Sequence, residues 1–161
     1  MVELKQKLNI GSGIAPVAGY LNVDWVEDDR VDFQHDLSFF PWPWDDNSIA
    51  EVRAFHYLEH VNDLRKTMEE IHRICVWDGL VDIMVPFAGT VWDVANPEHK
   101  QHFNHLSWNY FCVDFETSDL GLFQGFKKES EEFIPDGEWT LPGPIGTLYG
   151  VNMHTRLRVV K

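Results

Sequence analysis

A glycine-rich turn and two aspartates carry the strongest chemical signal in this sequence. Gly11-Ser12-Gly13 follows a short apolar segment, and glycines at such a turn let the backbone approach a ligand closely because no Cβ intervenes. Asp24 and Asp36 each end a later β-rich segment. Because ligands bind in the crevice at the carboxyl ends of parallel strands, we expect the turn and both carboxylates to meet there.

These groups suit the binding of an adenosine compound. A carboxylate at Asp24 can accept hydrogen bonds from both hydroxyls of a ribose, and Asp36 can accept one from an adenine amine while Leu37 covers the ring. Pro16 stands where the third glycine of a dinucleotide fingerprint would fall, which argues against bound NAD. Each of these residues taken alone could simply form a turn or end a strand. The functional interpretation therefore depends on their occurring together in this order.

Residues 56–60, HYLEH, offer a second chemistry, because H-x-x-E-H is a zinc-protease pattern. His56 and His60 on one helix could share a zinc ion, with Glu59 as the base of a hydrolase. That arrangement requires a long helix, whereas residues 49–55 predict a strand that ends just before this motif. The structural alternative makes His60 a packed or capping histidine.

Residues 96–105, NPEHKQHFNH, form a histidine-rich loop. Histidine titrates near neutral pH and can act as a general base, so His99 and His102 are candidates for catalytic contact with a substrate. A metal held by these two and His105 is disfavoured because their spacing rotates around a helix, and we predict no resident metal. A solvated loop with incidental histidines is the alternative.

The elements that must position these residues alternate between strands and helices. Apolar patterns predict strands at 7–11, 20–24, 31–36, 49–55 and 80–85, helices at about 62–75 and 107–118, and a terminal hairpin of 122–134 and 148–160. This order predicts one α/β domain over residues 1–161, with a Rossmann-like, mainly parallel sheet and a late antiparallel addition.

The first connection is too short for a helix. Few residues join Gly13 to Tyr20, whereas a parallel crossover normally takes about a dozen or more. One face of the sheet should therefore be thinly covered. We hypothesise that an aromatic segment folds over it, or that a partner subunit does so in a homodimer. The segment comprises Phe39, Phe40, Trp42 and Trp44.

Composition narrows the partners. The formal net charge is -13, so phosphate backbones and anionic lipid surfaces repel the chain. No window reaches the ~20 apolar residues of a membrane span, and no signal peptide is visible. Cys75 and Cys112 sit among apolar residues and are expected to be reduced thiols. We therefore predict a cytoplasmic protein that binds neither nucleic acid nor membranes.

The series of motifs resembles class I methyltransferases that depend on S-adenosylmethionine (SAM). The matching segments are KLNIGSG, GYLNVD, HDLSFFPWPWDDNSIAEV, AFHYLEHV and EEIHRICVWDGLVDIMVP. The nearest resemblance is to small, type 11-like members that lack the helix between the first two strands. It implies SAM as cofactor, methyl transfer to a small-molecule or sugar-like acceptor, trimmed helices, and the strand order 3-2-1-4-5-7-6 with strand 7 antiparallel.

The resemblance also implies roles for the first two motifs. Gly11, Ser12 and Gly13 would flank the methionine part of SAM. Asp24 would hold the ribose, and Trp25 would lie against the adenine.

The later motifs would complete the cofactor site. Asp36 and Leu37 would bind the edge and face of the adenine, and Phe55 and His56 would line the methionine and sulfonium region. The histidine-rich loop occupies the position that caps the acceptor pocket in this family. Asn9 replaces the family's usual acid in the first strand, which keeps open the alternative of a domain that binds SAM or another adenosine compound without catalysis.

Overall fold

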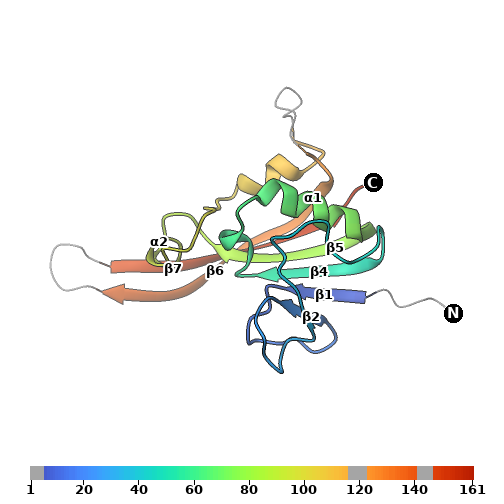
Figure 1. Cartoon of the computed structure of the whole chain (residues 1–161). Helices are drawn as coiled ribbons and strands as arrows, with labels where there is room; N and C mark the ends of the chain where they lie inside the picture. The colour runs from blue at the N-terminus through green and yellow to red at the C-terminus, as the bar shows by residue number, and fades with distance from the viewer. Residues whose placement is uncertain (1–5, 116–122, 141–146) are drawn as a thin grey trace.

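A seven-stranded sheet forms the framework of the protein (Figure 1). The computed structural model describes residues 6–115, 123–140 and 147–161. The strand order is β3-β2-β1-β4-β5-β7-β6. Strands β1 to β5 pair in parallel, and β7 runs antiparallel to both β5 and β6. The predicted Rossmann-like α/β fold, its strand order and its antiparallel seventh strand are confirmed.

Helices are few, as the resemblance implied. The strands are β1 (Gln6–Ile10), β2 (Leu21–Asp24), β3 (Phe33–Gln34), β4 (Ile49–Phe55), β5 (Cys75–Pro86), β6 (Phe126–Thr140) and β7 (Thr147–Val159). The helical segments are α1 (Leu64–Ile74), α2 (Val91–Ala95) and the 3-10 turns η1 (Leu58–His60) and η2 (Ser107–Phe111). None of the helices in the described ranges has the length and apolar character needed to cross a membrane.

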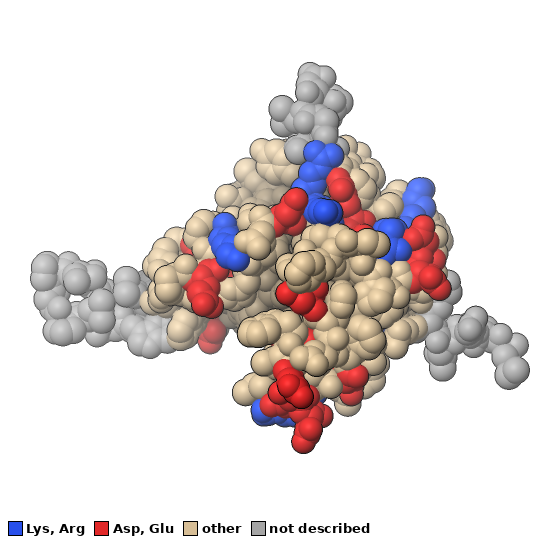
Figure 2. Space-filling view, in the orientation of Figure 1, with Lys and Arg blue, Asp and Glu red and all other residues tan. Residues whose placement is uncertain are grey.

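Basic side chains are outnumbered, with 13 Lys and Arg against 26 Asp and Glu. Figure 2 shows the Lys and Arg groups of one face as separate clusters, each beside Asp or Glu. With a net charge of -13, the long-range field of the molecule is negative.

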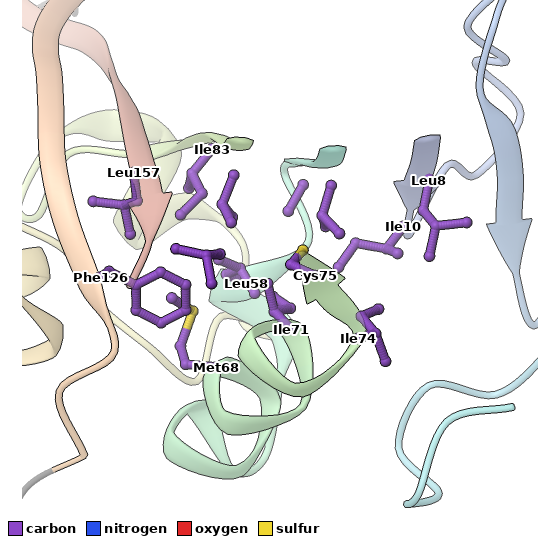
Figure 3. Packing of buried hydrophobic residues seen from close by; sticks show 14 of the residues in the cluster. Leu8, Ile10, Leu58, Met68, Ile71, Ile74, Cys75, Ile83, Phe126 and Leu157 are labelled. Atoms are coloured by element: carbon purple, nitrogen blue, oxygen red, sulfur yellow. The ribbon is translucent and has the colours of Figure 1, made fainter. Parts of the chain in front are cut away.

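One hydrophobic layer lies between α1 and the sheet (Figure 3). Helical spacing places Met68, Ile71 and Ile74 on the inner face of α1, where all three are buried. They belong to the same core cluster as Ile83 of β5 and Leu157 of β7. Each such side chain contributes about 1.5–3 kcal/mol on burial, so the layer anchors α1 to the middle of the sheet.

The junction between α1 and β5 differs from the sequence prediction. The helix ends at Ile74 and the strand begins at Cys75, before the Asp78-Gly79 turn signal. Asp78 has φ 60°, and the pairing of β5 with β4 shifts register in this region. The dipeptide therefore forms an irregularity within a long strand, because ladder hydrogen bonds to β4 hold the chain on both sides of it.

The second predicted helix is wrong beyond its first turn. Only η2 is helical, and Cys112 after it is extended. The Val113 N–H donates to the Phe126 carbonyl at 2.8 Å, so pairing with the start of β6 replaces the helix. Residues 116–118 of that prediction lie outside the described ranges. The terminal hairpin is confirmed, with β6 running further than expected, to Thr140.

Both cysteines are free and buried, as predicted. Burial raises the pKa of the Cys75 thiol to about 12 and that of the Cys112 thiol to about 11. Because the thiolate is the reactive form, both side chains act as inert core residues at neutral pH.

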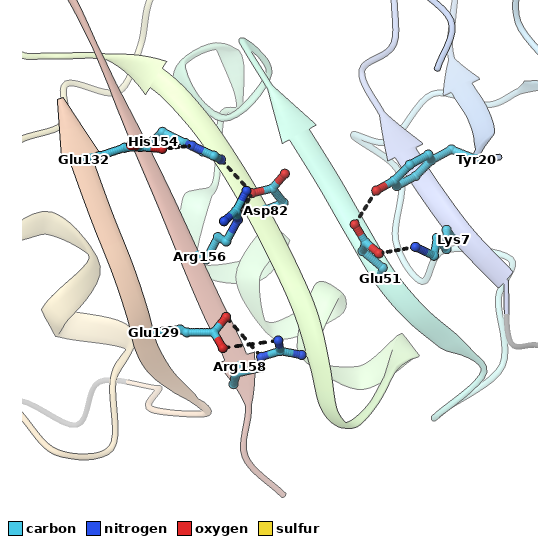
Figure 4. Close-up of polar contacts among 9 residues, drawn as sticks. All are labelled: Lys7, Tyr20, Glu51, Asp82, Glu129, Glu132, His154, Arg156 and Arg158. Carbon is cyan, nitrogen blue, oxygen red and sulfur yellow. Dashed lines mark hydrogen bonds and ion pairs between the residues drawn. The ribbon is translucent and has the colours of Figure 1, made fainter. Parts of the chain in front are cut away.

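In the described part of the chain, paired polar side chains rather than helices cover the other face of the central strands (Figure 4). Glu51 of β4 binds Lys7 of β1 at 2.6 Å and accepts a hydrogen bond from the Tyr20 hydroxyl. On the neighbouring strands, Nε2 of His154 lies 2.7 Å from the Asp82 carboxylate. Because these side chains are polar and paired, this face of the sheet can be exposed to solvent. It therefore does not need the crossover helices that cover both faces of a doubly wound sheet.

The aromatic segment does not cover that face, contrary to our hypothesis. The Trp42 N–H donates to Glu70 of α1 at 2.6 Å, and its indole N–H donates to the Leu37 carbonyl at 2.9 Å. The rings of Phe40 and Trp42 stack with centroids 6.0 Å apart, and Trp44 packs edge-on against Trp42. The segment therefore packs on the α1 side, directly behind the predicted adenine-binding residues.

Candidate functional site

A cavity of about 430 Å³ opens at the carboxyl ends of the first four strands. The predicted cofactor-binding residues that line it are Gly11, Asp24, Trp25, Asp36, Leu37 and His56. Four separate turns supply them, and the parallel sheet brings these turns to one edge. The structure thus brings six of the nine predicted cofactor-binding residues to one cavity.

The glycine turn has the backbone that its sequence requires. Gly11 and Gly13 have φ 62° and 50°, in the left-handed region that favours glycine. A Cβ on Gly11 would lie 2.3 Å from the Tyr57 ring, whereas nothing lies within 4 Å of one on Gly13. Ser12 is buried, and its N–H donates to a β2 carbonyl at 3.1 Å. Gly11 lines the cavity, whereas Ser12 and Gly13 are not among its lining residues.

We expect Gly11→Ala to lower the free energy of unfolding by about 2–4 kcal/mol, because strain at positive φ adds to the clash with Tyr57. Gly13→Ala is the matched control, since it has the same backbone strain in open space, and should cost about 1–2 kcal/mol. Urea denaturation monitored by tryptophan fluorescence measures both. Equal losses would mean that the contact with Tyr57 does not constrain the turn.

Asp24 is the best-anchored acid of the cavity, with only 8% of its surface exposed. Oδ2 accepts from the Gly13 N–H at 2.8 Å, and Oδ1 accepts from the Val26 N–H at 3.1 Å. A carboxylate has about four acceptor sites, so two remain for ligand hydroxyls. The adjacent Trp25 is 71% exposed, and its ring is free to lie against a planar ligand.

Asp36 and Leu37 form the next part of the rim. Hydrogen bonds from Ser38 hold the pKa of Asp36 below its ordinary value, so this exposed carboxylate is ionised at neutral pH and can only accept. Leu37 is buried beside it, and its carbonyl is held by the Trp42 indole. An acceptor next to an apolar surface fits the amine edge and the face of an adenine.

Tyr57 is a cavity residue that sequence reasoning missed. Burial, together with the nearby Asp36 and Asp24 charges, raises its pKa far above the ordinary value, so its hydroxyl stays protonated. His56 has φ 53°, which turns the chain sharply at the end of β4. An aromatic residue after a strand does not by itself indicate a ligand-binding residue in the sequence. Tyr57 reaches the cavity because the chain turns at His56.

Phe55 is not among the residues that line the cavity. The Arg53 guanidinium lies 3.5 Å from its ring centroid, and His154 packs edge-on against it. Alternation along β4 places it on the polar face of the sheet. Asn9 also belongs to that face: it donates to the Asn22 amide oxygen at 3.0 Å and accepts from Arg53 at 3.1 Å.

The two candidate catalytic histidines open on different cavities. A cavity of about 490 Å³ contains His99 and shares His56 and His60 with the first cavity. His102 lines another, of about 340 Å³, and its Nδ1 lies 2.8 Å from the buried Asp93 carboxylate. Of the two, His99 is therefore nearer to the predicted cofactor site.

The H-x-x-E-H segment lacks zinc-protease geometry. Strand β4 ends at Phe55, His56 has positive φ, and only Leu58–His60 forms a short 3-10 turn. His56 and His60 therefore do not share one face of a helix, and the helical zinc alternative is wrong. Nδ1 of His56 lies 3.3 Å from Oε1 of Glu59 instead.

Comparison with known proteins adds to this geometry. No family model matches the chain, and a search of curated proteins finds no match either. Among solved structures, a candidate methyltransferase from Bacillus halodurans aligns with TM-score 0.72 and 12% identity over 98% of this chain and 93% of that one. A SAM-dependent methyltransferase from Methanosarcina mazei aligns with TM-score 0.59 and 12% identity over 97% and 92%.

A third match was solved with the demethylated product bound. The trans-methyltransferase CalH in complex with S-adenosylhomocysteine (SAH) aligns with TM-score 0.61 and 14% identity over 97% of this chain and 51% of that one. At such identities the likeness concerns the path of the backbone. The strand order, the antiparallel seventh strand and these matches agree: the chain has the fold of class I SAM-dependent methyltransferases.

Proposed function

We propose that this protein binds SAM in the 430 Å³ cavity and transfers its methyl group to a small-molecule or sugar-like acceptor. The observation that carries the proposal is the convergence of Gly11, Asp24 and Asp36 on one cavity from three separate turns. A closely approachable backbone, an anchored carboxylate and a rim carboxylate beside a leucine are the groups that methionine, ribose and adenine need. The structural neighbours support the same cofactor.

The residues of this chain would mainly align the reactants. SAM supplies an already activated methyl group, so the protein has to hold an acceptor in line and exclude water. His56 and His60 line both the first cavity and the neighbouring 490 Å³ cavity. Their shared wall is where the methyl group would meet an acceptor bound beside Trp92 and His99.

Isothermal titration calorimetry with SAM and with SAH tests the proposal. We expect micromolar dissociation constants, equivalent to about -8 kcal/mol. NAD serves as the control and should not bind, because Pro16 replaces the third glycine of its fingerprint. The proposal fails if neither SAM nor SAH binds at millimolar concentration.

A SAM-binding domain without transferase activity is the second candidate, and Asn9 favours it. Its side-chain amide is held by Asn22 and Arg53 on the polar face, so it cannot take over the role of the missing acid. Incubation with SAM and a library of acceptors separates the two functions. Release of SAH with a methylated product supports the transferase, and SAM binding without product supports the second candidate.

We expect His99→Ala to slow turnover about 10- to 100-fold without changing the dissociation constant of SAM. His102→Ala should have a smaller effect, because His102 opens on a different cavity and reaches His99 only through Asp93. Initial rates and calorimetry on both variants check this. Unchanged turnover in His99→Ala would remove this residue from the acceptor site.

The charge distribution supports a small-molecule acceptor. The separated basic groups of Figure 2 offer no continuous track for a phosphate backbone on that face, and we propose neither nucleic acid nor a membrane as partner. The predicted homodimer and cytoplasmic location remain predictions. Light scattering over a concentration series measures the first of these.

A further inference from the structure

Three metal-ligating side chains meet at the wall between the two larger cavities: Glu59, His60 and His99. One potential ligand atom from each lies within 4.8 Å of the others. The rings of the two histidines are 4.8 Å apart between centroids, at 72°. Backbone hydrogen bonds hold the loop there, because the N–H groups of Lys100 and Gln101 donate to the Glu59 carbonyl at 2.7 and 3.0 Å.

The Glu59 carboxylate is poised for a cation. The residue is only 1% exposed. Its Oε1 lies 3.3 Å from His56 Nδ1, and its buried Oε2 makes no hydrogen bond within the described part of the chain. A buried acceptor left unpaired costs about 1–3 kcal/mol, and more when it is charged. A bound cation would offset that cost.

His99 is held in a tautomer that leaves one ring nitrogen available to a metal. Its Nδ1 lies 3.0 Å from the Asp93 carbonyl oxygen. Since a carbonyl can only accept, Nδ1 is the nitrogen that carries the proton in the neutral ring, and the lone pair is then on Nε2. Histidines that bind metals are commonly oriented by such a bond from the other ring nitrogen. Asp93 is itself fixed, because its carboxylate accepts from the Gly89 N–H at 2.8 Å.

We propose that Glu59, His60 and His99 bind a divalent transition metal, with Zn²⁺ as the representative ion. Two imidazoles and one carboxylate are a ligand set that suits zinc and leaves a fourth position open. With metal–ligand distances of about 2.0–2.1 Å, tetrahedral ligands lie about 3.4 Å apart, so side-chain movements of roughly 1 Å complete the site. This ligand set differs from both metal arrangements considered from the sequence.

Glu59, His60 and His99 all line the cavity that also contains Trp92 and Asp136. In the proposed transferase, on which this step rests, that cavity receives the acceptor. The metal would then bind an oxygen atom of the acceptor and hold it beside the cofactor cavity, so acceptors with a hydroxyl or carboxylate group are favoured. The metal site itself stands on the three side chains and is independent of the reaction.

Metal binding is measured on chelator-treated protein that comprises all 161 residues, purified without a histidine tag. Calorimetry with Zn²⁺ should give one equivalent, and Co²⁺ should give the intense visible absorption of a four- or five-coordinate site. His99→Ala should raise the dissociation constant of Zn²⁺ by about 10- to 100-fold or more. His105→Ala is the matched control from the same loop and should bind like the wild type, and circular dichroism verifies that both variants are folded.

The outcomes separate the metal site from the proposed function. Absence of a stoichiometric Zn²⁺ site in the wild type, or equal weakening in the His99 and His105 variants, overturns the metal site. If His99→Ala fails to fold, His60→Ala or Glu59→Gln is compared with His105→Ala by the same criterion. SAM binding to the metal-free protein is measured separately by calorimetry. If SAM binds and Zn²⁺ does not, only the metal site is refuted. If Zn²⁺ binds and SAM does not, only the proposed transferase is refuted.

Discussion

Replacing Asp24 by asparagine should weaken SAM binding about 100-fold. The substitution keeps the size of the side chain but removes its charge, and hydrogen bonds to charged groups contribute about 1.5–3 kcal/mol. A hundredfold loss corresponds to about 2.7 kcal/mol. Asparagine has a single acceptor oxygen, so it can keep only one of the two backbone N–H bonds that Asp24 accepts. The loss of affinity therefore combines the ribose contact with the loosened turn. Calorimetry with SAM measures the effect.

Asp32→Asn is the matched control for this experiment. Asp32 also accepts two hydrogen bonds from β2, from the N–H of Asn22 at 2.9 Å and its side-chain amide at 2.7 Å, but it does not line the cavity. Its variant should bind SAM within about twofold of the wild type. Unchanged affinity in Asp24→Asn, or equal losses in the two variants, would mean that Asp24 does not bind the ribose.

The second large effect concerns the support behind the adenine rim. We expect Glu70→Ala to lower the free energy of unfolding by about 2–4 kcal/mol. Glu70 is 8% exposed and accepts from the Trp42 N–H and from Arg73 Nη2, each at 2.6 Å. Breaking a buried pair costs about 3–5 kcal/mol, and the partial exposure of Arg73 reduces this value. Urea denaturation measures the loss.

Glu69→Ala provides the comparison on the same helix. Glu69 pairs with Arg65 at 2.8 Å, and both side chains are exposed, so its removal should cost no more than about 0.5 kcal/mol. Similar losses in the two variants would mean that the network around Glu70 does not support the fold. Because Trp42 also holds the Leu37 carbonyl, Glu70→Ala should weaken SAM binding as well.

The positions of the strands could be predicted from the sequence pattern, and their order from the resemblance to class I methyltransferases. The sequence signals are local: apolar alternation identifies the strands, and the residues after each strand lie at the edge where parallel strands end. Gly11, Asp24 and Asp36 needed only that topology to meet. The short first connection likewise predicted a sheet face without helices, although not what covers it.

Tertiary contacts decided the rest. Pairing with β4 carries β5 through Asp78-Gly79, and pairing with β6 replaces the helix expected after η2. His56 has a positive φ and turns the chain at the end of β4, so that Tyr57, and not Phe55, lines the cavity.

The polar face and the metal-ligating cluster also depend on the folded structure. The polar pairs of that face join strands that are distant in sequence, and the cluster joins η1 to the histidine-rich loop. No local pattern encodes which side chains will meet across such separations. Strands can be predicted from the sequence because the apolar periodicity of each one lies within a short segment. Long-range polar pairs form only after the sheet has fixed the distances between the strands that bear them.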